Sequence, residues 1–433
     1  MRGRTLLAWA EGWTSPRFHA RSHFAARYMS NFRLYGVFWV IKMTSEERHE
    51  RRYQRRKAAR EAAREKKIKD ALDFNTVFTF KHLYKSALLC FKGVSWKASV
   101  QAYKSRCGIN VARRLRDLRN GIFHLRKSPE FITRERGHER RINSIHIEDR
   151  VPEKCNSKYS LKPVLHRSLL YDNYASQENK GTDKARKRLK CMLERHIRKY
   201  GMTGGIIIFD FRHYFDSIKH ALVRHVMDRN YKDLQIIGIN MKIVRQARNK
   251  VGIVLGSENS QDFAISVPNM IDHYIKEVLR AEGFGRYMDD GWIIDSSMGK
   301  LKMIFRKLKE LAASIGLALH EFKSRIIRFG QPFTMLKRKY SFTETGKIIV
   351  RPVRESVIRE RRKLKRLYSR YIKGTMKLEA GYNSLTAWKS SLRGCKCWKI
   401  QRSVGDLYNE LYIWNWLSGK EIRLCTTKSY QMV

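Results

Sequence analysis

Two adjacent acids, Asp289 and Asp290, lie between a short basic and aromatic run and the apolar residues 292–294. A polar pair followed by a glycine between such runs predicts a β-hairpin whose turn carries the acids. Two carboxylates on one turn repel each other unless a cation neutralises them, and Mg²⁺ prefers oxygen ligands of this kind. The alternative is a solvated Asp-Asp turn that binds nothing.

A third acid, Asp210, directly follows the wholly apolar residues 206–209. Such a run predicts a strand buried on both faces, and a carboxylate at its end is costly to bury without a partner. We expect Asp210 to share a sheet with the Asp289-Asp290 hairpin, so that the three acids converge on divalent metal. Two ions held in this way stabilise the attacking and leaving oxygens of a phosphoryl displacement. Asp216 is predicted to be a helix N-cap rather than a ligand.

The composition is strongly basic, with 91 Lys and Arg against 40 Asp and Glu, a formal net charge of +51. So large a charge destabilises a compact state unless a polyanion neutralises it, which predicts salt-sensitive binding to nucleic acid. A hydrophobic content of 42% is still sufficient for folded cores.

The seven cysteines are an odd number, which argues for a reducing compartment and against a disulfide framework. Residues 35–41, an early apolar run, are too few to span a bilayer, so no membrane anchor is expected.

The first 43 residues allow two interpretations. Residues 1–42 are rich in Arg and aromatic side chains and contain one acid, Glu11, a composition typical of an organelle transit peptide. Alternatively Met43 is the true start, and the preceding segment is disordered or an over-extended gene prediction. Residues 44–47 form a capping-box pattern that predicts a helix beginning there. The charge-dense residues 44–72 predict a helix that is either a solvated face or an arm along a phosphate backbone.

Other patterns predict the elements around the acids. Apolar residues in 131–133 and 142–147 bracket a basic turn and predict a strand–turn–strand unit. Helical periodicity predicts helices at 184–200, 217–229, 267–279 and 301–314, and again through most of the chain after residue 355. Further strands are expected at 326–329 and 340–350.

Several motifs occur in the order found in one enzyme family. They are Asp210-Phe211-Arg212-His213-Tyr214-Phe215-Asp216, Gly256-Ser257-Glu258-Asn259-Ser260-Gln261, Tyr287-Met288-Asp289-Asp290 and Gly316-Leu317-Ala318-Leu319-His320-Glu321-Phe322-Lys323, with upstream blocks at 137–150 and 174–185 and a hairpin block at 333–347. Together they resemble the reverse transcriptases, closest to the bacterial and phage types: group II intron, retron, diversity-generating and defence-associated enzymes. The chain departs from the family pattern at Val254, where Pro is usual, at His138, where Lys is common, and at His320 and Ser324, where Asn and Thr are frequent.

The resemblance implies roles for individual residues. Asp210 and Asp289 would hold two Mg²⁺ ions, for which Mn²⁺ could substitute, and Asp290 would tune that site. Lys323 would protonate the departing pyrophosphate, unless it is one more surface cation. The nucleotide would be contacted by Arg140 at its triphosphate, by Phe215 under its sugar, where a 2′-hydroxyl would be rejected, and by Gln261 and Tyr287. The alternative for Phe215 is plain core packing.

The resemblance also implies an α+β right-hand polymerase. Its parts would be a disordered or mis-called segment (1–43), a basic helical extension (44–130), fingers (131–200), a palm with an antiparallel sheet packed on helices (201–350), and a helical thumb with a C-terminal tail (351–433). The implied reaction is RNA-templated DNA synthesis from dNTPs on a DNA or RNA primer. The alternatives are an RNA-binding scaffold or maturase-like factor with a dormant palm, and template-independent nucleotide addition in phage defence. The implied location is the cytoplasm of a bacterial or phage-infected cell, or an organelle if residues 1–42 are a transit peptide.

Overall fold

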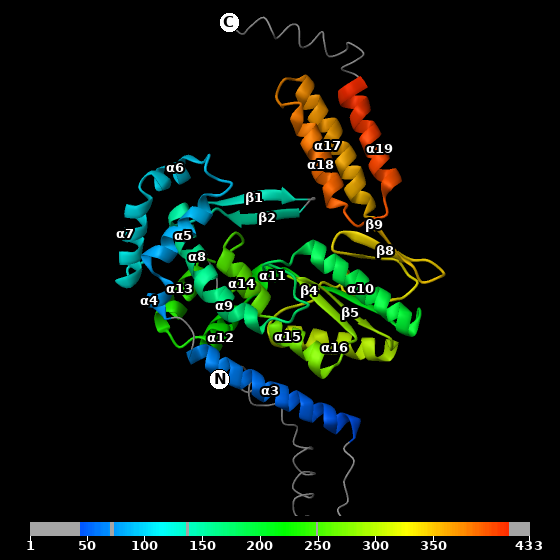
Figure 1. Cartoon of the computed structure of the whole chain (residues 1–433), viewed down its shortest axis with the longest axis horizontal. Helices are drawn as coiled ribbons and strands as arrows, with labels where there is room; N and C mark the ends of the chain where they lie inside the picture. Colours follow the sequence, from blue (N-terminus) through cyan, green and yellow to red (C-terminus); the bar gives the residue numbers. More distant parts are fainter. Residues whose placement is uncertain (1–43, 70–72, 136–137, 248–249, 415–433) are drawn as a thin grey trace, which may run out of the picture. The chain divides into compact units, whose positions relative to one another are not determined.

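The computed structural model describes residues 44–69, 73–135, 138–247 and 250–414, a mixture of helices and antiparallel sheets (Figure 1). It divides into two compact units, Met1–Ala59 and Arg60–Val433. The sheets lie in the second unit. The predictions for residues 1–43 and for the C-terminal tail beyond residue 414 fall outside the described residues.

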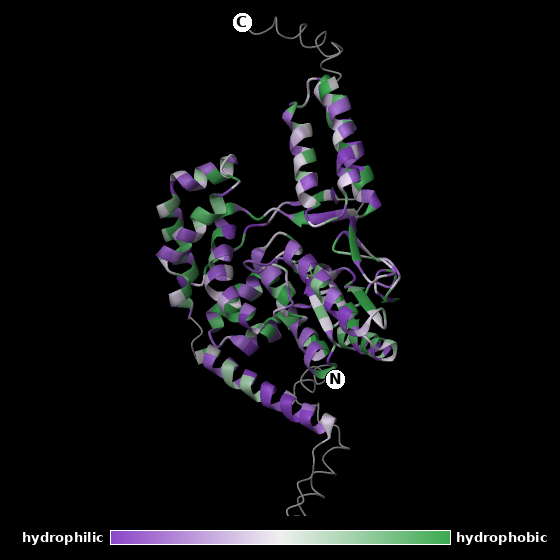
Figure 2. Cartoon of the chain, turned by 45° about the vertical axis from the view of Figure 1, so that its right-hand side comes forward, coloured by the Kyte–Doolittle hydropathy of each residue, from purple (hydrophilic) through white to green (hydrophobic). Residues whose placement is uncertain are grey.

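The predicted first helix is present as α3 (Ser45–Lys69). Its capping box is confirmed, because Thr44 Oγ1 accepts from the Glu47 backbone N–H at 3.2 Å and Glu47 Oε2 accepts from the Thr44 N–H at 2.8 Å. Figure 2 shows this helix coloured mostly as hydrophilic, as expected for a helix without an apolar stripe. None of the helices in the described part of the chain is long and apolar enough to cross a membrane.

A helical layer follows and packs on α8 (Ile147–Asn156). Its members are α4 (Phe74–Val77), α5 (Phe80–Phe91), α6 (Ala98–Ser105) and α7 (Cys107–Arg119). Fully buried Val77, Leu83, Val111 and Val151 join these helices in one core.

The predicted strand–turn–strand unit is the hairpin of β1 (Glu130–Glu135) and β2 (His138–Asn143). The prediction of a strand reaching residue 147 is wrong, because His146 caps α8 and accepts from the Glu148 N–H at 3.4 Å. A helical stretch then runs through η1 (Ser157–Leu161), α9 (Lys162–Leu165) and η2 (His166–Ser168). Residues 169–181 are not helical, and α10 (Thr182–Tyr200) follows them.

The central sheet has the antiparallel order β4-β5-β3-β6, built from β4 (Gly283–Tyr287), β5 (Asp290–Asp295), β3 (Gly205–Asp210) and β6 (Arg325–Arg328). Successive side chains of a strand point to opposite faces. Ile207 and Ile293 enter one hydrophobic core with α16 (Met298–Ser314), whereas Ile206 and Ile294 enter another with α10. The prediction that β3 is buried on both faces is therefore confirmed.

The helices between β3 and β4 differ from their predicted bounds. They are α11 (Tyr214–Ser217), α12 (His220–Asn230), α13 (Leu234–Val244), α14 (Glu258–Ser266), α15 (Asn269–His273) and η3 (Tyr274–Val278). The helix predicted at 267–279 is confirmed as the continuous stretch of α15 and η3, which is separate from α14 because Pro268 has no N–H with which to continue the ladder. The N-cap prediction for Asp216 is wrong: Asp216 lies inside α11, and Lys219 is the N-cap of α12.

The chain continues through a three-stranded antiparallel sheet into helices. The strands are β7 (Phe333–Met335), β8 (Arg338–Phe342) and β9 (Ile348–Pro352). The helices are α17 (Arg354–Ile372), α18 (Glu379–Ser391), α19 (Trp398–Asn409) and η4 (Glu410–Trp414), and α17–α19 share a separate core that includes Leu364, Leu385 and Val404.

Candidate active site

The register of the central sheet brings the three predicted acids together. Asp210, the last residue of β3, is paired directly with Asp290, the first residue of β5. The Phe211 N–H donates to the Asp289 carbonyl oxygen at 3.2 Å. Acids about eighty residues apart in sequence thus occupy one end of two neighbouring strands.

The backbone of Asp210 is held by the segment before β6. The Ser324 hydroxyl accepts from the Asp210 N–H at 3.1 Å and lies 3.3 Å from the Asp210 carbonyl oxygen. That oxygen also accepts from the His320 N–H at 2.7 Å. His320 and Ser324, two of the departures from the family pattern, therefore fix the position of an acid.

The acidic turn is a tight hairpin loop. Tyr287 pairs with Asp290, so Met288 and Asp289 are the two loop residues. Met288 has φ +55°, the positive value that primed hairpin turns require at their first position and that a residue with a side chain rarely adopts. Gly291 follows the turn, and a Cβ there would lie 2.1 Å from a ring carbon of Phe209. The close approach of β3 to β5 beside the acids therefore depends on a glycine.

A buried ion pair between Arg286 and Asp272 stabilises this turn. Arg286 is fully buried and makes a bidentate contact with the carboxylate of buried Asp272 at 2.7–2.9 Å. Its Nη1 donates to the Met288 carbonyl oxygen at 2.9 Å and its Nη2 to that of Ile265 at 2.8 Å. Sequence reasoning missed both residues of this pair. The available signals were an Arg inside a strand and an Asp inside an apolar helix, and neither indicates its partner.

Burial and then the charges of neighbouring acids perturb the pKa values of Asp289 and Asp290. Burial, followed by the charges of Asp289 and Asp210, raises the pKa of Asp290 to about 7. Burial, with a further contribution from Asp210, also raises the pKa of Asp289, while Lys323 and Arg140 oppose that rise. Lys323 Nζ donates to Asp210 Oδ2 at 3.1 Å from a largely exposed position. The Lys323 ammonium group thus lies beside the acids, whose negative charge stabilises a cation.

A divalent cation beside these acids would need ligands besides the protein. Within the described residues, no group of three or more His, Cys, Asp or Glu side chains is placed to hold a metal ion, so the expected convergence of three acids on one metal is not seen as a ligand cluster. Mg²⁺ is commonly bound by only one or two carboxylates together with substrate phosphates and water. Asp210 and Asp290, paired at the strand ends, and Asp289 in the adjoining turn would supply the carboxylates in that mode of binding.

The remaining predicted residues have different surroundings. Tyr287 is half-buried and faces Asp290 across the hairpin. Arg140 lies in β2, and its charge acts on Asp289. Phe215 is half-buried against the core that contains Ile207 and Ile293. Its ring lies edge to face with that of Tyr214, at a centroid distance of 5.9 Å. Residues 136 and 137 of the predicted fingers segment are outside the described residues.

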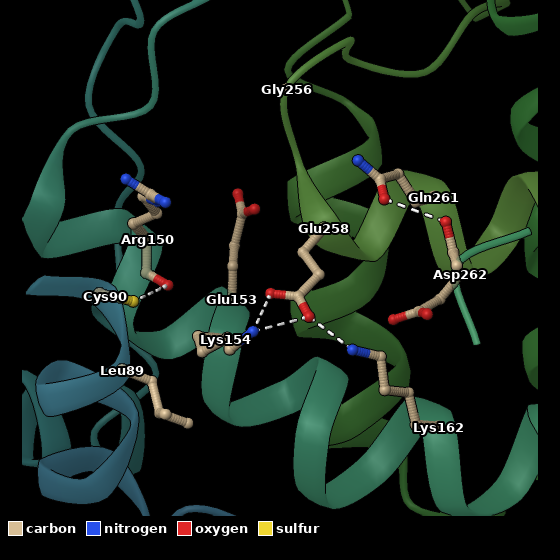
Figure 3. Close-up of a pocket in the computed structure, with 11 residues that line it drawn as sticks. Leu89, Cys90, Arg150, Glu153, Lys154, Lys162, Gly256, Glu258, Gln261 and Asp262 are labelled. Atoms are coloured by element: carbon tan, nitrogen blue, oxygen red, sulfur yellow. Dashed lines mark hydrogen bonds and ion pairs between the residues drawn. The ribbon is translucent and has the colours of Figure 1, made fainter. Parts of the chain in front are cut away.

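Gln261 lies on α14 at the edge of a cavity of about 320 Å³ (Figure 3). Its Oε1 accepts from the Ser176 hydroxyl at 3.1 Å. In the same cavity, Glu258 is held between Lys154 at 2.9 Å and Lys162 at 2.6 Å, as Figure 3 shows. Ser257 caps α14, and its hydroxyl donates to Glu153, whose pKa is raised to about 7 by burial. The first residues of this motif, Ser257 and Glu258, are therefore held by a hydrogen bond and two ion pairs at the start of α14.

No family model matches the chain, and no curated protein matches it. Among solved structures, the chain is similar to an apo telomerase from Candida tropicalis truncated from its C-terminal domain, with a TM-score of 0.40 and 14% sequence identity. The match covers 51% of this chain and 54% of the telomerase, so the chain spans about half the length of that neighbour.

Proposed function

We propose that the chain is a nucleotidyltransferase that synthesises DNA on an RNA template. The observation that carries the proposal is the pairing of Asp210 with Asp290 at the ends of β3 and β5, with Asp289 in the adjoining turn. Carboxylates converging from separate segments are the ligand set that phosphoryl transfer requires. The net charge of +51 supports a nucleic-acid substrate. The choice of an RNA template rests on the order of the sequence motifs.

In this proposal Asp210 and Asp289 hold Mg²⁺ or Mn²⁺, which would neutralise charge on the attacking and leaving oxygens. Asp290, whose pKa is raised to about 7 by burial and the neighbouring acids when no cation is bound, would set the charge of the site. Lys323, now paired with Asp210, would release that carboxylate and transfer a proton to pyrophosphate. Arg140 would bind triphosphate oxygens, for which a guanidinium group is suited.

Three further residues would select the nucleotide. Phe215 would lie under the sugar, while Gln261 and Tyr287 would contact the incoming nucleotide. The corresponding domain arrangement has fingers from β1 to α10, a palm around the central sheet, and a thumb formed by α17–α19. The helices before β1 would be a basic extension that contacts nucleic acid.

Primer extension tests this proposal. The full chain, an RNA template, a DNA primer, dNTPs and Mg²⁺ are expected to give elongated primer. Asp289→Ala should lower the rate at least about a hundredfold, the usual loss when an electrostatic contact to the reacting phosphate is removed. Asp216→Ala is the matched control, because Asp216 is an exposed acid in the same motif, and it should stay within about twofold of wild type.

Two outcomes would replace the proposal. Equal RNA binding by wild type and Asp289→Ala, with extension by neither, would indicate a scaffold with a dormant palm. Extension that continues at the same rate when the template is omitted would indicate template-independent nucleotide addition.

A further inference from the structure

Tyr171, in the segment between η2 and α10, is an exposed aromatic side chain surrounded by cations. Its side chain is 61% exposed. Lys180 Nζ lies 5.3 Å from the ring centroid, Lys184 Nζ 5.7 Å and the Arg188 guanidinium carbon 5.7 Å. Each distance is within the range at which a cation is attracted to an aromatic ring.

These cations are only partly neutralised by the protein. Arg188 Nε donates to Asp172 Oδ1 at 3.1 Å, so its charge is compensated. Lys180 Nζ instead donates to the carbonyl oxygens of Tyr171 and Asn173, each at 2.8 Å. Burial and then the charge of Lys184 lower the pKa of Lys180. In the described part of the chain neither of these two lysines forms an ion pair with a carboxylate, so the cluster is complementary to an anion.

The cluster is joined to the strand that leads into the acidic turn. The Arg286 N–H donates to the Asp172 carbonyl oxygen at 3.0 Å, and the Tyr174 N–H donates to the Arg286 carbonyl oxygen at 3.0 Å. Arg286 precedes Asp289 by three residues. With about 3.8 Å between consecutive Cα atoms and about 5 Å across a hydrogen-bonded pair, the Tyr171 backbone lies within about 20 Å of the acids.

We propose that Tyr171 is a stacking platform for a base of single-stranded nucleic acid, with Lys180 and Lys184 binding the flanking phosphates. An exposed ring bordered by two lysines that form no ion pair with a carboxylate of the described residues provides both parts of the chemistry that holds a single strand, a face for a base and charge for the backbone. A duplex buries its base faces and offers this site only phosphates. The inference rests on the proposed function in one respect: the nucleic-acid strand bound at Tyr171 would be the one that reaches the acids.

Binding measurements on the full chain test the platform without any need for synthesis. The probe is a fluorescein-labelled single-stranded RNA dodecamer at fixed salt concentration. Tyr171→Ala should raise its Kd about five- to 150-fold, the range expected for loss of one stacked base, whereas Tyr171→Phe should stay within about twofold. The matched control is Tyr382→Ala, which removes a tyrosine of similar exposure, 58%, from α18 and should also stay within about twofold.

Two further probes separate stacking from charge. On a single-stranded DNA dodecamer without bases, Tyr171→Ala should bind as wild type does, because there is nothing to stack. Lys184→Ala should reduce the slope of log K against log salt by about 0.7, the value for one lost phosphate contact on a single strand, while Tyr171→Ala leaves the slope unchanged.

The inference is overturned if Tyr171→Ala binds the RNA dodecamer within about twofold of wild type, or if it loses the same affinity for the strand without bases. Failure of the proposed function is recognised separately, by primer extension. A chain that extends primers while Tyr171→Ala binds normally keeps the proposed activity and lacks this platform. An inactive chain with a Tyr171-dependent affinity keeps the platform alone.

Discussion

Replacing Asp290 with Asn should change how the stability of the protein depends on pH. The folded state raises the pKa of Asp290 from 3.8, the ordinary value for Asp, to about 7. The folded protein therefore holds this proton more tightly than the unfolded chain does, so stability falls as pH rises from about 4 to about 7 and is constant above that. At 1.36 kcal/mol for each unit of pKa, the loss from Asp290 between pH 5 and pH 8 is about 3 kcal/mol. Asp290→Asn removes a titrating group and keeps the side-chain shape.

Urea unfolding at pH 5 and pH 8, in the presence of EDTA, measures this effect. Between pH 5 and pH 8, wild type should lose about 3 kcal/mol of its free energy of unfolding relative to Asp290→Asn, because only wild type carries the titrating Asp290 carboxyl. Asp216→Asn, which changes an exposed acid, should follow wild type. In separate samples without EDTA, free Mg²⁺ at ten times its Kd should stabilise wild type at pH 8 by about 1.4 kcal/mol and should stabilise Asp290→Asn less. Parallel pH dependence in wild type and Asp290→Asn would refute the reasoning, since it would mean that Asp290 ionises normally in the fold.

Three other substitutions test parts of the site. Phe215→Ala should accept ribonucleotides at least about tenfold more readily relative to deoxyribonucleotides in single-nucleotide extension, and an unchanged ratio would leave Phe215 a core residue only. Arg286→Met should lower the free energy of unfolding by about 3–5 kcal/mol because Asp272 stays buried and unpaired; adding Asp272→Leu should restore much of that stability without restoring primer extension. Gly291→Ala should cost about 1–3 kcal/mol in urea unfolding because the new methyl group clashes with a ring of the core, and a neutral result would contradict the close packing beside the acids.

The position of the acids was predictable from the sequence because both local patterns are strong. The uniformly apolar residues before Asp210 indicate a strand buried on both faces, and the acidic pair before Gly291 indicates a tight turn. The capping box at Thr44 was predictable for the same reason, since its partners are three residues apart.

The remainder depends on contacts that local patterns do not encode. The ion pair of Arg286 and Asp272 is formed by residues of two elements, and each residue alone would be expected at the surface. The predicted strand end at residue 147 failed because an apolar run followed by His146 and acids can equally begin a helix. The cation cluster at Tyr171 was missed because its lysines are unremarkable among 91 basic residues until the fold gathers them around one ring.

Binding of Mn²⁺ to the full chain tests most directly whether the three acids act as one site. It is measured as the loss of the electron paramagnetic resonance signal of free Mn²⁺. With a dNTP present, wild type should bind Mn²⁺, and Asp210→Asn and Asp289→Asn should each weaken that binding at least about tenfold, while Asp216→Asn leaves it unchanged. Equal affinity in wild type, Asp210→Asn and Asp289→Asn would show that the paired strand ends hold no metal and would contradict the account.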